Sequence, residues 1–416
     1  MRLYFSLTVF VWSCTLYGCG EREQKKERLA EAIQRIVQRP FPQHISFPGG
    51  IRPNHLSQDR LDQAITRKYR DWKAAYVRAS NGNTPGGGIY IEMEGVGADG
   101  GTKSSSEAHG YGMIIFALMA GHDPDAGRFF DGMVNMFDQH RSTGNPNLMS
   151  WVISDSESSS DNEDSATDGD MDIAYALLLA DRQWGKGGAI DYLEAAKKMI
   201  TKGIKASEMG SQSLRPKLGD WDDNGWNTRT SDWMPGHFRA FQQATGDVFW
   251  AGAIETVFTL AARIRQGYSK STGLMPDFVV GETPRPAPPR FLERATDGDY
   301  SWNACRFPLR MALDYLHHGS AQAKGALDPL VRWIRSKTGG NPGAITAGYT
   351  LVGEDLNSYG SAAFTGPLIV ASTIDAAYQS FMNAGWDLID RAREDYYSDT
   401  ISLLSMLLVS GNWWAP

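Results

Sequence analysis

The sequence predicts an all-α fold in which helical hairpins close into a toroid and the loops at one end build a cleft. Three observations lead to this prediction. Apolar residues recur at helical spacing in about twelve segments, no long linker separates these segments, and strand-like alternation is scarce. With 416 residues, of which 42% are hydrophobic, the chain can bury one large core.

The amino-terminal residues predict export. One arginine precedes an apolar run, Leu3 to Val11, and small residues follow at 18–20, which is typical of a signal peptide over residues 1–18. The stretch ending at Cys19 also resembles a bacterial lipobox. We therefore expect a secreted or periplasmic protein, with a lipid anchor on Cys19 as the alternative to simple cleavage.

Residues 19–45 are expected to form a stem or first helix, and residues 46–416 a single domain. Ser57 can cap the first helix of that domain, which should run to about Ala79. Short strands are expected at Gly88–Met93 and Phe278–Val280. Further helices are predicted over 107–121, 125–141, 169–184, 189–206, 233–245, 247–266, 302–317, 320–337, 360–377, 379–392 and 398–409.

Composition excludes several classes of protein. The 41 Lys+Arg and 48 Asp+Glu give a net charge of −7, whereas a nucleic-acid surface needs a cationic excess. The mature chain keeps at most Cys305 as a free thiol, so no disulfide framework is expected.

No zinc, phosphate-loop or serine-hydrolase motif is present, and we expect neither metal nor cofactor. The acidic segment 154–164 is predicted to be a solvated loop.

A first candidate for acid–base chemistry is Glu107, which lies at a predicted helix start. Gly110 and Gly112 follow it and would let a ligand approach closely. A favourable charge–dipole interaction at the helix N-terminus explains a carboxylate there at least as well.

A second candidate is the run Asp168, Asp170 and Asp172. Asp168 and Asp172 are four positions apart and share one helix face. Three carboxylates exceed what capping needs, and crowded carboxylates raise one another's pKa, which suits acid–base chemistry.

Two further segments combine tryptophan with charged side chains. They contain Asp220 and Trp221, and then Arg229, Asp232 and Trp233. A tryptophan beside a carboxylate suits a sugar site, because the ring stacks on the sugar face while the acid binds hydroxyls. Alternatively, Asp232 only caps the next helix and Arg229 only pairs with an acid.

The last candidate segment, residues 291–310, supplies Glu293, Asp297 and Asp299 as loop carboxylates. It follows a proline-rich loop and leads into a predicted helix.

Seven motifs, taken in order, resemble glycoside hydrolase family 8 over nearly all of the mature chain. They are SSEAHGYGM (105–113), NPNLMSWV (145–152), ATDGDMDIAYALLLADRQW (166–184), LGDWD (218–222), TRTSDW (228–233), ACRFPLRMALDY (304–315) and GNWWAP (411–416). The resemblance implies an inverting endo-glycanase with an (α/α)6 barrel.

The resemblance also implies roles for individual residues. Glu107 becomes the general acid, and Asp168 belongs to the subsite that holds the distorted, reacting sugar. Tyr111 and Arg306 are placed near the catalytic centre. Three tryptophans become sugar platforms, namely Trp151, Trp233 and Trp302. The remaining substrate-binding candidates are Asp170, Asp220, Trp221, Arg229, Asp232 and Asn303.

The chain departs from much of the family at Asn303, where many members carry an aspartate as the general base. The departure matches a subfamily, rich in chitosanases and mixed-linkage β-glucanases, whose base is a glutamate on the preceding loop. Glu293 is the best match to that glutamate, with Asp297 and Asp299 as alternatives.

An inverting hydrolase needs one protonated carboxyl and one carboxylate that holds a water, separated by about 6.5–9.5 Å. A long loop can bring Glu293 to that separation from Glu107, whereas two carboxylates on one helical turn cannot reach it. Burial in the cleft should raise the pKa of Glu107 and keep it protonated, while Glu293 should stay hydrated.

The sequence therefore predicts a monomeric, exported endo-β-1,4-glycan hydrolase that needs no protein partner. Its polysaccharide would be chitosan or a β-glucan such as lichenan or carboxymethyl-cellulose. The acids at 168, 170, 220, 232 and 297 would attract the amines of chitosan, but could equally bind neutral hydroxyls. The second hypothesis, motivated by Asn303, is a non-catalytic glycan-binding lipoprotein.

Overall fold

The computed structural model describes residues 36–82, 84, 86–93, 101–186 and 188–416. The predicted signal peptide, the lipobox at Cys19 and most of the expected stem lie outside these residues. Within them, no helix is both long and apolar enough to cross a membrane.

One compact unit spans Gln38–Pro416, so it begins earlier than the predicted boundary at residue 46. Its first residues are held by backbone hydrogen bonds, since Phe41 N donates to Ala120 O (2.8 Å) and Ile45 N donates to Gly411 O (2.6 Å). These bonds attach the segment to the domain.

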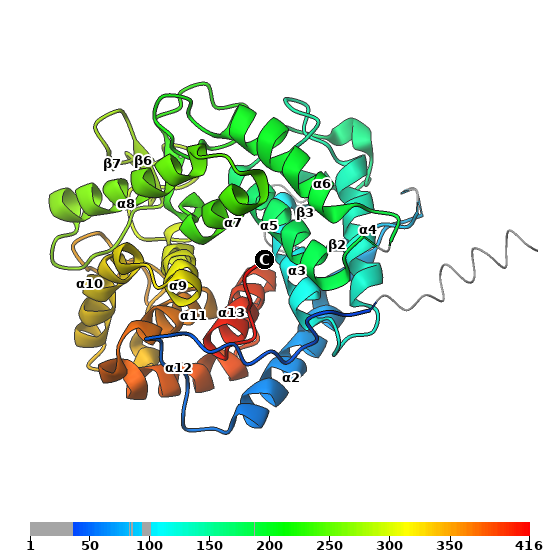
Figure 1. The fold of residues 1–416 in the computed structure, drawn as a ribbon. Helices are drawn as coiled ribbons and strands as arrows, with labels where there is room; N and C mark the ends of the chain where they lie inside the picture. The colour runs from blue at the N-terminus through cyan, green and yellow to red at the C-terminus, as the bar shows by residue number, and fades with distance from the viewer. Residues whose placement is uncertain (1–35, 83, 85, 94–100, 187) are drawn as a thin grey trace, which may run out of the picture. The chain divides into compact units, whose positions relative to one another are not determined.

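Two concentric rings of helices make up this unit (Figure 1). Most of the inner helices are buried almost all round. Every residue of α11 and α13 is buried, because neighbours enclose these helices on all sides. The inner ring consists of α3 (Ser106–Met119), α5 (Thr167–Trp184), α7 (Pro235–Thr245), α9 (Phe307–His318), α11 (Ala362–Ala371) and α13 (Tyr396–Val409).

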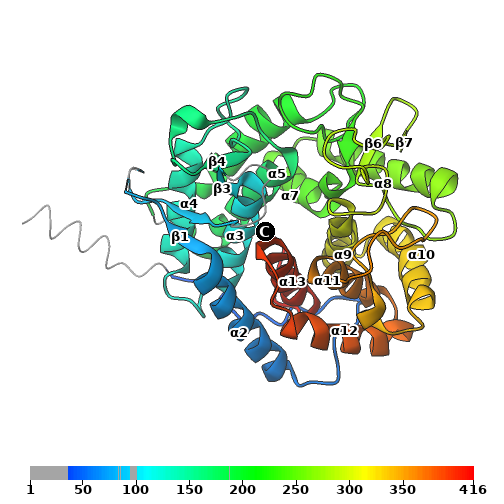
Figure 2. The same cartoon turned by 180° about the vertical axis from the view of Figure 1, so that it is seen from behind.

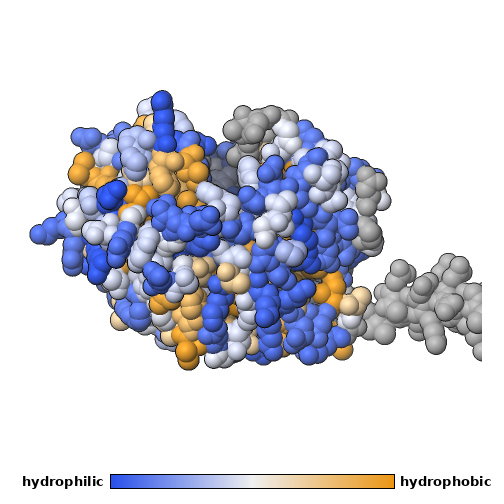
Figure 3. All heavy atoms as spheres, turned by 90° about the horizontal axis from the view of Figure 1, so that it is seen from above, coloured by the Kyte–Doolittle hydropathy of each residue, from blue (hydrophilic) through white to orange (hydrophobic). Residues whose placement is uncertain are grey.

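The outer helices bury only one face. In α2, apolar buried residues recur every three or four positions, at Leu61, Ile65, Tyr69 and Trp72. The opposite faces carry polar residues, and hydrophilic groups dominate the side of the molecule in Figure 3. The outer ring consists of α2 (Gln58–Tyr76), α4 (Ala126–Gln139), α6 (Tyr192–Lys198), α8 (Phe249–Tyr268), α10 (Ala321–Lys337) and α12 (Gln379–Arg391).

Outer and inner helices alternate along the chain, and α13 closes the ring by packing against α2. This arrangement is an (α/α)6 barrel, so the predicted fold class is confirmed. The predicted cap is also present, because the Ser57 side chain accepts a hydrogen bond from Arg60 N. Helix α2 ends at Tyr76, three residues before the predicted end at Ala79, and strand β1 begins at Val77.

Two predicted helices are interrupted. The segment 189–206 forms α6 and then a π-helical stretch, η2 (Met199–Glu208). The segment 360–377 ends its α-helix at Ala371 and continues as short 3-10 turns. These turns are η6 (Ser372–Ile374) and η7 (Ala376–Tyr378), and the others are η1 (Ser159–Asp161), η3 (Thr230–Asp232), η4 (Ala304–Arg306) and η5 (Pro342–Ala344).

Short strands fill the loops between helices (Figure 2). The antiparallel pairs are β1 (Val77–Ala79) with β2 (Ile89–Ile91), and β3 (Thr102–Ser105) with β4 (Val152–Ser154). A three-stranded sheet contains β5 (Thr228–Arg229), β6 (Phe278–Val280) and β7 (Arg285–Pro286). The two strands expected from the sequence are confirmed as β2 and β6.

Helices α3 and α5 approach each other closely through glycines. A Cβ atom on Gly110 would lie 2.6 Å from Asp172 Cβ, and one on Gly112 would lie 2.6 Å from Ile91 Cγ1. The prediction that these glycines admit a ligand is therefore wrong, because both face packed protein. The small size of Gly110 instead lets α3 and α5 run side by side, which makes Glu107 and Asp168 neighbours, whereas Gly112 makes room for Ile91 of β2 and Met133 of α4.

Candidate active site

The starts of inner helices meet at one end of the barrel. Glu107 lies in the first turn of α3, which Ser105 caps by accepting a hydrogen bond from Ala108 N (3.2 Å). Asp168 lies in the first turn of α5, and Tyr396 is the first residue of α13. Arg306 directly precedes α9. The resulting cluster lies at the amino-terminal ends of these four helices.

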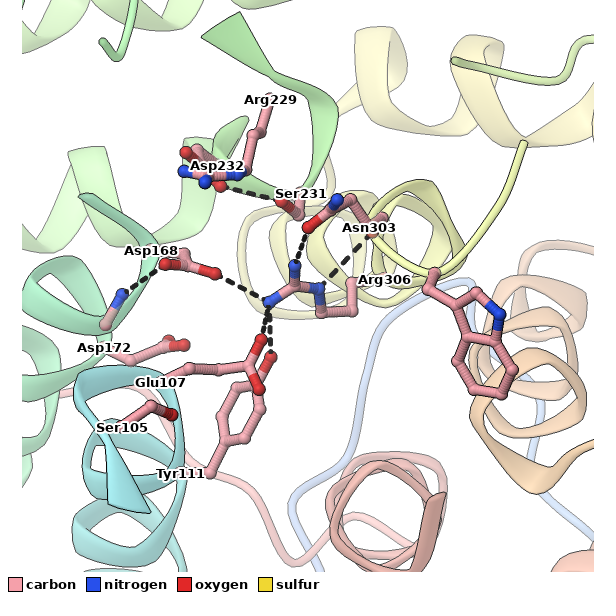
Figure 4. Close-up of polar contacts among 12 residues, drawn as sticks. Ser105, Glu107, Tyr111, Asp168, Asp172, Arg229, Ser231, Asp232, Asn303 and Arg306 are labelled. Carbon is pink, nitrogen blue, oxygen red and sulfur yellow. Dashed lines mark hydrogen bonds and ion pairs between the residues drawn. The ribbon is translucent and has the colours of Figure 1, made fainter. Parts of the chain in front are cut away.

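Arg306 is the centre of this cluster (Figure 4). Its Nη1 atom forms an ion pair with Glu107 Oε2, donates to Asp168 Oδ2 (2.8 Å) and donates to the Tyr111 hydroxyl (3.1 Å). Its Nη2 atom donates to Asn303 Oδ1 (2.7 Å). The side chain is only 2% exposed, so these charge-assisted bonds are shielded from water.

The pKa values of the two acids that contact Arg306 are shifted in opposite directions. Burial raises the pKa of Glu107 to about 7, with the negative charge of Asp168 adding to the increase and Arg306 opposing it. Burial also disfavours the charged form of Asp168, but Arg306 and Arg229 outweigh it and hold the pKa of Asp168 below its usual range. At neutral pH, Asp168 is therefore ionised, while Glu107 keeps its proton to a much higher pH than an ordinary glutamate does.

Glu293 approaches the same cluster from a loop. Its side chain is 36% exposed, and its Oε2 atom accepts from Asn303 Nδ2 (2.9 Å). Its Oε1 atom accepts from Arg229 Nη2 (3.2 Å). The side chains of Asn303 and Arg306 therefore connect Glu293 to Glu107 by hydrogen bonds. Within the described residues, no hydrogen bond joins the two carboxyl groups directly.

The two alternative bases lie elsewhere in this loop. The Asp297 carboxylate accepts backbone N–H groups from residues 292, 293 and 294, and the residue is only 1% exposed. These bonds occupy its oxygens, which leaves Asp297 unsuited to bind a water. Asp299 is half-buried, and burial raises its pKa. Neither side chain contacts Asn303 or Arg306 in the described part of the chain.

The predicted platforms divide into exposed and buried tryptophans. Trp151 is 45% exposed and its carbonyl accepts from Ser106 N (3.0 Å), which places it beside the start of α3. Trp221 is 42% exposed, and Trp302 is partly exposed and packs nearly perpendicular to Phe364. These three rings can stack on a sugar.

The platform role of Trp233 is wrong, because this side chain is fully buried. Its Nε1 atom donates to Thr228 Oγ1 (3.1 Å), and its ring packs against Phe307. The residue lies where the chain turns from η3 into the inner helix α7, and at this turn the indole packs inward.

Three aspartates predicted to bind substrate serve the protein instead. Asp170 and Asp232 are fully buried, so the prediction of direct substrate contact is wrong for both. Asp170 Oδ1 accepts from Met149 N (2.8 Å). Asp232 lies beside Arg229 (Figure 4), and burial, together with the charge of Asp168, raises its pKa to about 7. Asp220 accepts from Ser142 Oγ (2.5 Å) and Ser165 N (2.9 Å), which ties two loops together.

The prediction that neighbouring acids raise one another's pKa holds only in part for the run on α5. The pKa of Asp170 is raised, by burial first and then by Glu208. Asp172 is equally buried, but it pairs with Arg310 and His237, and these hold its pKa at about 2. Arg306, directly before α9, and Arg310, within it, keep Asp168 and Asp172 ionised, and the α5 motif alone does not contain these arginines.

Sequence reasoning missed three residues of the site. The Tyr396 hydroxyl lies 3.4 Å from Glu107 Oε1 as a donor. Asp277 Oδ1 accepts from the backbone N–H groups of residues 301, 303 and 304, and so fixes the turn that carries Asn303. Glu208 pairs with Asp170 beneath the loops. None belongs to a local motif, and only the fold brings them to the site.

The model of glycosyl hydrolases family 8 matches residues 56–411. The chain belongs to this family. An endoglucanase from Bacillus sp. (strain KSM-330) is 44% identical over 382 residues, which cover 91% of this chain and 82% of the relative. A β-glucanase from Niallia circulans is 43% identical over 383 residues, covering 90% and 91% of the two chains.

A solved structure gives the same result for the family 8 fold. The β-1,3-1,4-glucanase from Paenibacillus sp. X4 superposes with a TM-score of 0.87 at 42% identity, covering 91% of this chain and all of that one. The more distant family 8 xylanase from Teredinibacter turnerae, at 17% identity, has a TM-score of 0.74 and supports the fold alone. The protein is therefore an endo-acting glycosidase of family 8.

Proposed function

We propose that the protein cleaves β-glucans internally with inversion at the anomeric carbon, using Glu107 as the general acid and Glu293 as the general base. One observation carries the proposal. The hydrogen-bonded series Glu107, Arg306, Asn303 and Glu293 joins a shielded carboxyl to an exposed one at a single site. Two carboxyl groups in such different surroundings suit the two roles of an inverting hydrolase.

In the proposed reaction, Glu107 donates its proton to the glycosidic oxygen as the bond to the anomeric carbon breaks. A water attacks that carbon from the opposite face and gives a proton to Glu293. Asp168, held ionised by Arg306, would bind hydroxyls of the reacting sugar. The proton gained by Glu293 then returns to Glu107 through solvent, which completes the cycle.

The proposed substrate is a neutral β-glucan, with mixed-linkage β-1,3-1,4-glucan as the first choice. Two similar relatives are described as a β-glucanase and a β-1,3-1,4-glucanase. The charge argument for chitosan weakens, because Asp170, Asp220 and Asp297 are bonded to backbone or hydroxyl groups. Arg229 and Arg306 also stand beside the reacting groups and would repel an ammonium-bearing sugar.

The test compares release of reducing ends from lichenan and from chitosan, and follows the anomeric configuration of the first product by NMR. We expect cleavage of lichenan, an α-anomeric product, and little cleavage of chitosan. Faster cleavage of chitosan would contradict the substrate proposal. A β-anomeric product would contradict inversion.

Two variants test the residue roles. Glu107→Gln and Glu293→Gln should each lower kcat by at least about 1,000-fold and leave oligosaccharide binding intact, because each removes a group that acts on the transition state. Glu194→Gln, an exposed glutamate on outer helix α6, serves as the control. Full activity of Glu293→Gln would assign the base elsewhere. A wild-type protein that binds glucan but hydrolyses none would favour the non-catalytic hypothesis.

We also propose that the chain acts outside the cell as a monomer. Export rests on the leader-like residues 1–18, and lipid attachment on Cys19. Metabolic labelling with a palmitate analogue, in the wild type and in Cys19→Ala, tests the lipid. Labelling that persists in the variant would contradict attachment at this cysteine.

A further inference from the structure

The turn that carries Glu293 is built around one buried carboxylate. Asp297 Oδ2 accepts from Leu292 N (2.8 Å) and Glu293 N (3.0 Å), and its Oδ1 atom accepts from Arg294 N (2.7 Å). Three consecutive backbone N–H groups thus point at a side chain that is 1% exposed. From the sequence, Asp297 is an alternative base and one of the acids that could attract chitosan amines, and it has no part in the proposed reaction.

The backbone of Asp297 is in turn hydrogen-bonded to the three-stranded sheet of β5, β6 and β7. Phe278 N, in β6, donates to Asp297 O (2.9 Å), and Asp297 N donates to Arg294 O (3.2 Å). Strand β6 pairs with β5, which carries Arg229. Arg229 holds the Glu293 side chain, so Asp297 and Arg229 fix the backbone and the side chain of one residue from the same sheet.

Apolar packing contributes little at the tip of this turn. Residues 292–295 are exposed, and Leu292 is 42% exposed. The nearest ring contact is between Phe291 and Phe278, with centroids 5.7 Å apart. A general base must reach water, so its turn cannot be buried. Hydrogen bonds to Asp297 must supply the rigidity that packing supplies elsewhere.

We propose that Asp297 is a positioning residue for hydrolysis, which holds Glu293 in place through the backbone of its turn. The inference rests on the proposed role of Glu293 as general base. It assigns Asp297 no contact with substrate or water. A base displaced by about 1 Å can lose about 100-fold in rate, so this turn governs turnover more than substrate binding.

The substitution Asp297→Asn separates this role from a purely structural one. An asparagine offers one acceptor oxygen where the carboxylate uses two, so it must lose the bond to residue 294 or the bonds to residues 292 and 293. We expect kcat on lichenan to fall about 10- to 100-fold. KM should stay within about twofold, because the exposed tryptophans and Asp168 are untouched.

Asp375→Asn is the control for loss of an aspartate that binds backbone N–H away from the site. Asp375 accepts a backbone N–H from Ala377 (2.9 Å), is exposed, and follows the carboxy-terminal end of the inner helix α11. It should keep wild-type kcat and Tm. A second variant, Asp297→Glu, keeps both oxygens and the charge but is one methylene longer. It should fold and still lose at least about tenfold in kcat.

The outcomes separate the two proposals. The positioning role is overturned if Asp297→Asn or Asp297→Glu keeps wild-type kcat while Glu293→Gln is inactive. The proposed function is left intact by that result. Full activity of Glu293→Gln overturns the proposed function itself. A rise in KM at unchanged kcat in Asp297→Asn would mean that the turn binds substrate, and this also overturns the inference.

Discussion

The buried pair Asp170 and Glu208 should make the stability of the protein depend on pH in a way that one substitution removes. Both side chains are fully buried, and their carboxyl groups interact with each other. Asp170 Oδ2 and Glu208 Oε2 have no hydrogen-bond partner among the described residues, so we expect one proton to be shared between these two oxygens. Burial raises the pKa of both groups, that of Glu208 to about 8.

The sign of the effect follows from proton counting. In the unfolded chain both acids are ionised above about pH 5, whereas the folded protein keeps the shared proton until about pH 8. The stabilisation from this proton is complete below the unfolded pKa values and is lost as the pH rises toward 8. Each retained proton changes the free energy of unfolding by about 1.4 kcal/mol per pH unit. Between pH 6 and 8 the loss is roughly 3 kcal/mol at most.

Glu208→Gln should abolish this part of the dependence. The carbonyl oxygen of the introduced glutamine can accept from Ser165 Oγ, as Glu208 Oε1 does now (2.6 Å), and its amide nitrogen can donate to Asp170 in place of the shared proton. The variant and the wild type should have similar stability at pH 6, and the variant should be more stable at pH 8.5. Other acids with raised pKa values, such as Glu107 and Asp232, remain in both proteins, so the difference isolates the pair.

Urea titrations at pH 6, 7, 8 and 8.5 measure this difference, provided that both proteins give the same m-value. KM on lichenan should be unchanged, because both side chains are fully buried. If the free energies of unfolding of wild type and variant differ by the same amount at all four pH values, the shared proton is refuted. A large rise in KM would refute the placement of the pair behind the loops.

Three further outcomes are expected. Because the pKa of Glu107 is about 7, kcat/KM should fall as the pH rises above 7. Arg306→Met should move this fall in kcat/KM to higher pH, because it removes a cation that favours the ionised form of Glu107. An unchanged pH profile would contradict the electrostatic link between the two residues. Trp151→Ala should weaken oligosaccharide binding by about 1–3 kcal/mol, measured by calorimetry, whereas Trp233→Ala should cost about 3–5 kcal/mol of stability and leave affinity unchanged. Dialysis against a chelator should leave activity intact, and restoration of lost activity by added calcium would contradict this expectation.

The sequence could predict the ring of helices because helical periodicity is a local signal. It could also place Asp168 and Asp172 on one face of α5, and both do contact arginines at the start of α9. It could not predict that Asp170, two positions from each, is buried against Glu208. That outcome depends on which helix packs behind α5, and the spacing of apolar residues does not encode the partner.

The tryptophans show the same limit. Trp151 and Trp233 both lie in motifs shared with the family, yet one is 45% exposed and the other is fully buried. The difference arises from how a loop enters the next inner helix. Likewise, Asp297 and Glu293 are equivalent as loop carboxylates in sequence, and only the backbone N–H groups around Asp297 separate their roles.

The bonds between the first and last segments of the domain have a consequence for biosynthesis. Gln43 N donates to Asn412 Oδ1 (2.8 Å) across 369 positions of sequence, beside the contact of α13 with α2. A nascent chain leaving the ribosome cannot form this seam until its final helix has emerged. Until then the partial ring keeps an apolar edge open to solvent, so ribosome stalling late in translation should yield an aggregation-prone arc that chaperones must shield.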